Sequence, residues 1–149
     1  MGLKTINKSV NINAPKEKVW KVLLDDKYTR TWYNEFSEGT YAETDWTPGS
    51  KALFRDKSGM GLIAKITENK PYEVIAMEHQ GMITSSGKED YDSEMAKSVK
   101  GAIEKYTLSE DNGTTRLQIT CDMEEKYFDS MSNAWERALN KVKELSENG

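Results

Sequence analysis

The longest regular pattern of apolar and polar positions runs from Asp122 to Gly149, the last quarter of the chain. Apolar residues recur there at alternating steps of three and four, which places them on one face of an amphipathic helix. These residues are Phe128, Met131, Trp135, Ala138, Val142 and Leu145. We therefore predict one long terminal helix that rests on a core, with Asp122 as its N-cap and Glu125 completing a capping box.

Alternation with a period of two dominates the chain before this helix and predicts β-strands. The predicted strands cover residues 4–13, 36–44, 51–56, 60–68, 72–80, 102–108 and 116–123. Two of the turns between them have strong signals, because Pro48-Gly49 and Asn112-Gly113 are residue pairs that tight turns prefer. The segment 81–99 is irregular and polar in its middle, and we expect a long loop there.

Two short helices are predicted after the first strand. Pro15 suits the first position of a helix, where its missing N–H costs no hydrogen bond. The face expected to be buried consists of Val19, Trp20, Leu23 and Leu24. A second short helix is expected over residues 25–32.

The order of these elements is a strand, two short helices, six strands and one long helix. Such segregation of strands and helices is typical of the α+β class. We predict a curved seven-stranded antiparallel sheet wrapped around the long C-terminal helix, with the two short helices on the same side. A length of 149 residues is compatible with one domain that builds its own core, so a single domain over residues 1–149 is expected.

Composition excludes several classes of protein. The 21 basic and 25 acidic residues give a net charge of −4, which argues against a nucleic-acid-binding domain. No apolar run approaches the roughly 20 residues that span a membrane, and the N-terminal residues lack the apolar core of a signal peptide. The single cysteine allows no intramolecular disulfide. A cytoplasmic location is therefore expected.

Candidate chemistry is sparse. Asp90, Asp92 and Glu94 alternate as in a calcium loop, but Met95 stands where such a loop needs glycine, and the closing glutamate is missing. The sequence has no phosphate-binding or dinucleotide-binding glycine motif and no cluster of metal-ligand residues, so no cofactor and no metal are expected. His79 and Cys121, the only residues of their types, could both face the interior, as a core histidine and a small buried thiol or as reactive groups.

Glu104 is the most informative polar residue. By alternation it shares a face with Tyr106 and Leu108 that should look toward the terminal helix. A carboxylate in that position must be paired or hydrogen-bonded, because burial of a lone charge is costly. It can be a polar anchor for a ligand, an acid or base, or a structural acceptor for a neighbour such as Lys8 or Tyr106. Lys8 itself is expected to extend its ammonium group to water from a strand near the sheet edge.

Several of these residues together resemble a known superfamily. The matching segments are Asn13-Ala14-Pro15-x-x-x-Val19-Trp20, Trp32, Pro48-Gly49, Gly101-x-x-Glu104-x-Tyr106-x-Leu108 and Asn112-Gly113-x-Thr115-x-Leu117. The chain is similar over nearly its whole length to the START-like, helix-grip (SRPBCC) superfamily. Within it, the chain most resembles the group named for the C-terminal domain of the heat-shock-protein-90 ATPase activator.

This resemblance implies a deep cavity between the long helix and the curved sheet, used in the superfamily to hold apolar molecules such as lipids. We therefore expect binding of a small, largely apolar ligand of unknown identity, without a cofactor. The candidates for lining the cavity are Trp32, Phe54, Leu62, Met77, His79, Glu104, Tyr106, Ile119, Met131 and Trp135. Two alternatives remain open: a co-chaperone-like module that binds a protein partner, and an enzyme of the cyclase or hydrolase kind that uses Glu104.

Overall fold

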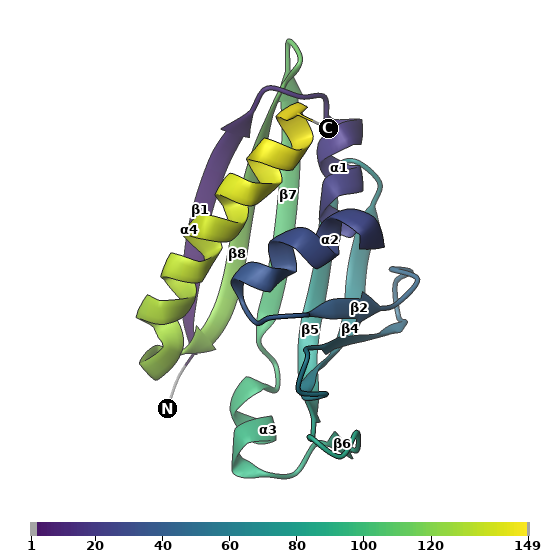
Figure 1. Ribbon diagram of the computed structural model, residues 1–149, viewed down its shortest axis with the longest axis vertical. Helices are drawn as coiled ribbons and strands as arrows, with labels where there is room; N and C mark the ends of the chain where they lie inside the picture. The colour runs from purple at the N-terminus through teal and green to yellow at the C-terminus, as the bar shows by residue number, and fades with distance from the viewer. Residues whose placement is uncertain (1–2, 149) are drawn as a thin grey trace.

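The computed structural model describes residues 3–148 as an antiparallel sheet with helices packed on one face (Figure 1). The strands are β1 (Leu3–Ile12), β2 (Tyr41–Glu43), β3 (Lys51–Arg55), β4 (Gly61–Lys70), β5 (Val74–Ile83), β6 (Glu89–Asp90), β7 (Ile103–Asp111) and β8 (Thr114–Glu124). The α-helices are α1 (Lys16–Leu24), α2 (Asp26–Trp32), α3 (Glu94–Val99) and α4 (Glu125–Asn148), and a short 3-10 helix covers Tyr33–Glu35.

The strands lie in the order β1-β8-β7-β5-β4-β3-β2, with β6 paired to β5. Helix α4 crosses one face of this sheet and packs against β1, α1 and α2 (Figure 1). This arrangement confirms the predicted α+β class and the predicted grip of a curved sheet around a long helix. The additional strand β6 has only two residues and lies in the segment expected to be a loop.

Helix α4 buries the apolar face that the sequence predicts. Trp135, Ala138 and Val142 are all buried between the helix and the sheet, and Asn140 on the other side is exposed. The predicted cap is wrong, because β8 continues to Glu124 and leaves Asp122 inside the strand. The Asp122 carboxylate instead accepts hydrogen bonds from the Thr5 hydroxyl at 2.6 Å and the Ile103 N–H at 3.0 Å. Gly149, the predicted end of the helix, lies outside the described residues.

The two short helices place a large aromatic side chain in the core. Helix α1 begins at Lys16, one position after the predicted start at Pro15, and Pro15 is its N-cap. Trp20 is only half-buried, contrary to the prediction, because it lies on the side of α1 that contacts Tyr72. Trp32, at the end of α2, is fully buried and its indole N–H donates to the Val22 carbonyl at 2.9 Å.

Two segments differ from the sequence prediction. Within residues 36–44 only Tyr41–Glu43 forms a strand, because the helical turn after α2 continues through Tyr33–Glu35. The segment 81–99 contains the end of β5, strand β6 and helix α3. Ser93 caps α3, since its hydroxyl accepts from the Ala96 N–H at 3.1 Å.

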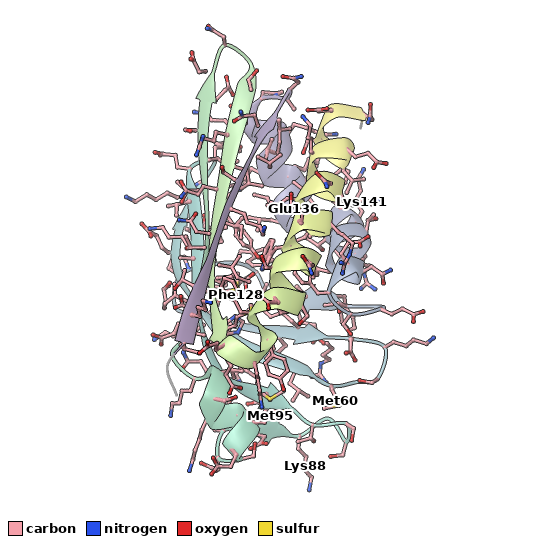
Figure 2. All side chains as sticks on the ribbon, turned by 90° about the vertical axis from the view of Figure 1, so that its left-hand side faces the viewer. Met60, Lys88, Met95, Phe128, Glu136 and Lys141 are labelled. Carbon is pink, nitrogen blue, oxygen red and sulfur yellow. The ribbon has the colours of Figure 1, made fainter. Side chains whose placement is uncertain are left out.

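The edge strand β1 is held to α4 by side chains. Lys8 extends from the sheet and forms an ion pair with Glu136 of α4 at 2.8 Å, and the Lys4 ammonium lies 4.3 Å from the centre of the Phe128 ring (Figure 2). Lys8 therefore reaches the surface as predicted. No helix within residues 3–148 is long and apolar enough to cross a bilayer.

Candidate functional site

A cavity with two adjacent chambers lies between α4 and the sheet. The inner chamber has a volume of about 130 Å³. Its wall is mostly aromatic and consists of Trp32, Tyr33, Phe36, Thr40, Phe54, Leu62, His79, Glu104, Tyr106, Cys121, Met131 and Trp135. Trp135 is central to this wall, with ring centres 4.8 Å from Phe36, 5.7 Å from Tyr106 and 6.0 Å from Trp32.

The outer chamber has a volume of about 300 Å³ and lies toward α3 and the start of α4. It shares five wall residues with the inner chamber, so the two chambers are adjacent: Leu62, His79, Glu104, Cys121 and Met131. Four of the seven methionines of the chain line the outer chamber, namely Met82, Met95, Met123 and Met131. Methionine side chains are flexible and polarisable, and they adapt to apolar surfaces of different shape.

The outer chamber leads to a surface depression between α3 and the first turns of α4. Met95 of α3 is 53% exposed and Tyr127 of α4 is 44% exposed, and both line the outer chamber and this depression. Figure 2 shows Met95 below the start of α4. The depression also carries two acidic and two basic residues, namely Glu94, Glu124, Lys97 and Lys126. This mouth is therefore apolar at its centre and balanced in charge at its rim.

Strand pairing brings four polar side chains together at the junction of the two chambers. Glu104 of β7 lies opposite Cys121 of β8, and its neighbour in the sequence, Ile103, lies opposite Glu78 of β5, next to His79. The Glu104 carboxylate accepts from the His79 Nε2–H at 3.2 Å, from the Tyr106 hydroxyl and from the Cys121 thiol at 3.8 Å. All four side chains line the inner chamber.

These contacts determine the ionisation of the cluster. Burial by itself would raise the pKa of Glu104, but the hydrogen bond and charge of His79 and the bonds from Tyr106 and Cys121 outweigh it and lower the pKa. Burial, together with the Glu104 charge, raises the pKa of Tyr106 and that of the Cys121 thiol well above their usual values. Glu104 is therefore an anion at neutral pH, beside a phenol and a thiol that keep their protons.

Two polar atoms in the cavity wall lack a partner. His79 Nδ1 and the Trp135 indole N–H are both buried, and neither has a hydrogen-bond partner of regular geometry within residues 3–148. The Trp135 N–H lies close enough to the Cys121 thiol to oppose the rise in its pKa, yet without a regular hydrogen bond. Both side chains line the inner chamber.

The chemistry that this wall can perform is limited. Cys121 is a poor nucleophile, because attack requires a thiolate and burial keeps the thiol protonated. Across residues 3–148 no group of three histidine, cysteine, aspartate or glutamate side chains could hold a metal ion. In the former calcium candidate, Asp90 accepts the backbone N–H groups of Asp92 and Ser93 and closes a turn.

Eight of the ten residues predicted to line the cavity lie in the wall of the inner chamber: Trp32, Phe54, Leu62, His79, Glu104, Tyr106, Met131 and Trp135. The other two, Met77 and Ile119, are fully buried core residues, and contact of any of the ten with a ligand stays a prediction. Residues missing from the prediction include Tyr33, Phe36 and Thr40. The aromatic spacing of Trp32, Tyr33 and Phe36 is helical, and it was a signal that the second short helix continues toward the cavity.

Comparisons with known proteins agree with this architecture. The family described as "Activator of Hsp90 ATPase homolog 1-like protein" matches residues 13–147. No curated protein matches the sequence significantly.

Many solved structures share the fold. A protein from Mesorhizobium loti has a TM-score of 0.74 at 13% identity, with 95% of this chain and 96% of that chain covered. The Aha1 dimer from Colwellia psychrerythraea has a TM-score of 0.74 at 20% identity, with 98% of each chain covered. A protein from Chromobacterium violaceum has a TM-score of 0.71 at 20% identity, with 97% of this chain and 98% of that chain covered. Identities of this size support the fold alone.

Proposed function

Because the chain belongs to the family of activator of Hsp90 ATPase homolog 1-like proteins, we propose that it binds a small, largely apolar molecule between α4 and the sheet. The observation that carries this proposal is the two-chambered cavity with its mostly apolar wall. Small-molecule sites are typically concave and apolar, with a few polar groups that fix the orientation of the ligand. In this cavity, those few polar groups would be Glu104, His79, Tyr106 and Cys121.

Binding of ligands and interaction with proteins are the two activities of this family. The distribution of exposed apolar side chains favours the binding of a ligand. Among residues 3–148 the large apolar side chains with the greatest exposure are Leu3, Met60, Tyr72, Tyr91, Met95 and Tyr127. Of these six, Met95 and Tyr127 line a common depression, and it adjoins the outer chamber of the cavity. Two apolar side chains at the opening of the cavity are suited to the entry of an apolar ligand.

Uptake of a neutral fluorescent probe tests this proposal. N-phenyl-1-naphthylamine fluoresces strongly in apolar surroundings and weakly in water, so we expect saturable enhancement with about one probe per chain. Met131 lines both chambers, and a larger side chain there should block the passage between them. We expect Met131→Trp to weaken probe binding at least about tenfold, a loss of about 1.4 kcal/mol.

Met60→Trp is the matched control, because Met60 is 39% exposed and lies in none of the chamber walls. It introduces the same side chain and should leave the dissociation constant of the probe unchanged. Equal binding by the Met131→Trp variant and the unmodified protein would show that the probe binds elsewhere, and no enhancement at all would contradict the proposed function.

A further inference from the structure

The two unpartnered atoms of the cavity wall could form hydrogen bonds with a ligand group of a particular kind. Buried polar atoms are nearly always hydrogen-bonded, because the loss of water is otherwise uncompensated. His79 Nδ1 and Trp135 Nε1 are exceptions to this rule, although the other ring nitrogen of His79 is bonded to Glu104. Both residues belong to the inner chamber, and His79 also faces the outer one. A ligand that reaches the junction of the chambers can supply the missing partners.

The two atoms differ in what they need. The Trp135 indole N–H is only a donor. In a neutral His79 ring whose Nε2–H donates to Glu104, Nδ1 is an acceptor, and in a charged ring Nδ1 becomes a donor. A hydroxyl group serves both states, because it donates one hydrogen bond and accepts two. An amine cation leaves Trp135 without an acceptor, and an ether or hydrocarbon leaves a neutral His79 without a donor.

The charge of Glu104 disfavours a carboxylate ligand when His79 is neutral. Glu104 is buried and ionised, and its oxygens already accept from three side chains: His79, Tyr106 and Cys121. A second anion at the junction would face this charge at close range in apolar surroundings, where repulsion is poorly screened. No arginine or lysine is among the residues that line the two chambers, so a neutral His79 leaves this charge without a cation beside it.

Resting on the proposed function, we propose that the ligand is an apolar molecule with an uncharged hydroxyl group held by His79 Nδ1 and the Trp135 indole N–H. Apolar cavities of about 150 Å³ hold a benzene ring, so the inner chamber of about 130 Å³ has room for about one ring. The hydroxyl lies at the passage from this chamber to the outer one. The remaining apolar part of the ligand lies in the methionine-lined outer chamber, whose side chains adapt to its shape.

Three compounds of one shape and different head groups test this inference on the unmodified protein. Titration calorimetry at pH 7 compares 2-naphthol, naphthalene and 2-naphthoate. We expect 2-naphthol to bind at least about tenfold more tightly than naphthalene, because it forms hydrogen bonds with two buried atoms that otherwise have none. We expect 2-naphthoate to bind more weakly than naphthalene.

One substitution connects the preference to its structural cause. Trp135→Phe keeps an aromatic side chain in the wall and removes the indole N–H. We expect it to reduce the preference for 2-naphthol over naphthalene to within about threefold, while naphthalene still binds. Trp20→Phe is the matched control, since Trp20 packs on Tyr72 outside both chambers and should keep the full preference.

The outcomes separate this inference from the proposed function. Equal affinity for 2-naphthol and naphthalene, or tightest binding of 2-naphthoate, overturns the hydroxyl site and leaves the apolar cavity in place. The same holds if none of the three binds to a protein that takes up N-phenyl-1-naphthylamine. Failure to take up that probe as well overturns the proposed function itself. The comparison of compounds needs no variant, so a misfolded Trp135→Phe protein does not affect it.

Discussion

At the scale of single residues, Glu104 shows how the fold holds a charge in an apolar interior. Its side chain is 17% exposed, and its own strand and both neighbouring strands provide its donors: Tyr106 from β7, His79 from β5 and Cys121 from β8. Hydrogen bonds to a charged group are stronger than neutral ones, which offsets the cost of burial. Lys8, considered as a partner from the sequence, pairs with Glu136 at the surface instead.

We expect Glu104→Gln to lower the free energy of unfolding by about 1.5–3 kcal/mol at pH 7, because the amide cannot replace the charge-assisted hydrogen bonds. The pKa of Glu104 is lower in the folded protein, so its stabilisation is present above the ordinary value of 4.5 and is lost as the pH falls below it. Urea unfolding at pH 7 and at pH 3 measures the free energy of unfolding of the unmodified protein and of the variant. The difference between these two free energies should be smaller at pH 3. A difference as small as that of the surface control Glu136→Gln would contradict this role.

Alternation along 102–108 predicted that Glu104 faces inward, and the structure agrees. The identity of its partners was not predictable, because it depends on the register of three strands. Register is set by turns and by packing across the whole sheet, and here it places Cys121 opposite Glu104 and His79 on the diagonal.

At the scale of elements, α4 is the part of the fold that the sequence predicts best. Its apolar period of three and four is long, and no local signal competes with it. Helix α3 was missed because six residues are too few for a periodic signal, although Ser93 is a usual N-cap. Strand 36–44 was predicted too long because Phe36, an aromatic residue that also fits a strand, caps the 3-10 turn and lines the cavity.

Trp135 connects α4 to the aromatic wall, and we expect Trp135→Ala to destabilise the protein by about 3–5 kcal/mol. The indole is buried and contacts the rings of Trp32, Phe36 and Tyr106. Asn140→Ala, on the exposed side of the same helix, should change the stability by less than about 0.5 kcal/mol. Chemical denaturation of both variants makes the comparison, and similar losses would mean that α4 does not hold the core through this face.

At the scale of the whole molecule, the cavity has an energetic cost. An unfilled cavity costs about 24 cal/mol per Å³ when the surrounding structure cannot collapse. A closed and empty cavity of the size of the inner chamber, about 130 Å³, would lower the stability by about 3 kcal/mol. A rigid wall explains why it stays open, since sheet, α2 and α4 are joined by aromatic contacts across it.

A ligand that fills this space should raise the thermal stability. At a free concentration one hundred times its dissociation constant, it adds about 2.7 kcal/mol. For a chain of this length we expect the melting temperature to rise by about 5–10 °C. Differential scanning calorimetry with N-phenyl-1-naphthylamine measures the shift. The Met131→Trp variant, matched in probe concentration, should show little of it, and an equal shift in that variant would argue against occupation of the cavity.

The pairing of β1 with β8 has a consequence for how the chain folds. Ile6 lies opposite Cys121, so β1 is synthesised more than one hundred residues before the strand with which it pairs. Closing such a long loop loses chain entropy before the stabilising contacts have formed. Proteins that are rich in contacts between distant residues therefore fold slowly. The hairpin of β7 and β8 around Asn112-Gly113 closes locally and can form early. We expect a nascent chain to keep β1 unpaired, and available to chaperones, until β8 and α4 have been synthesised.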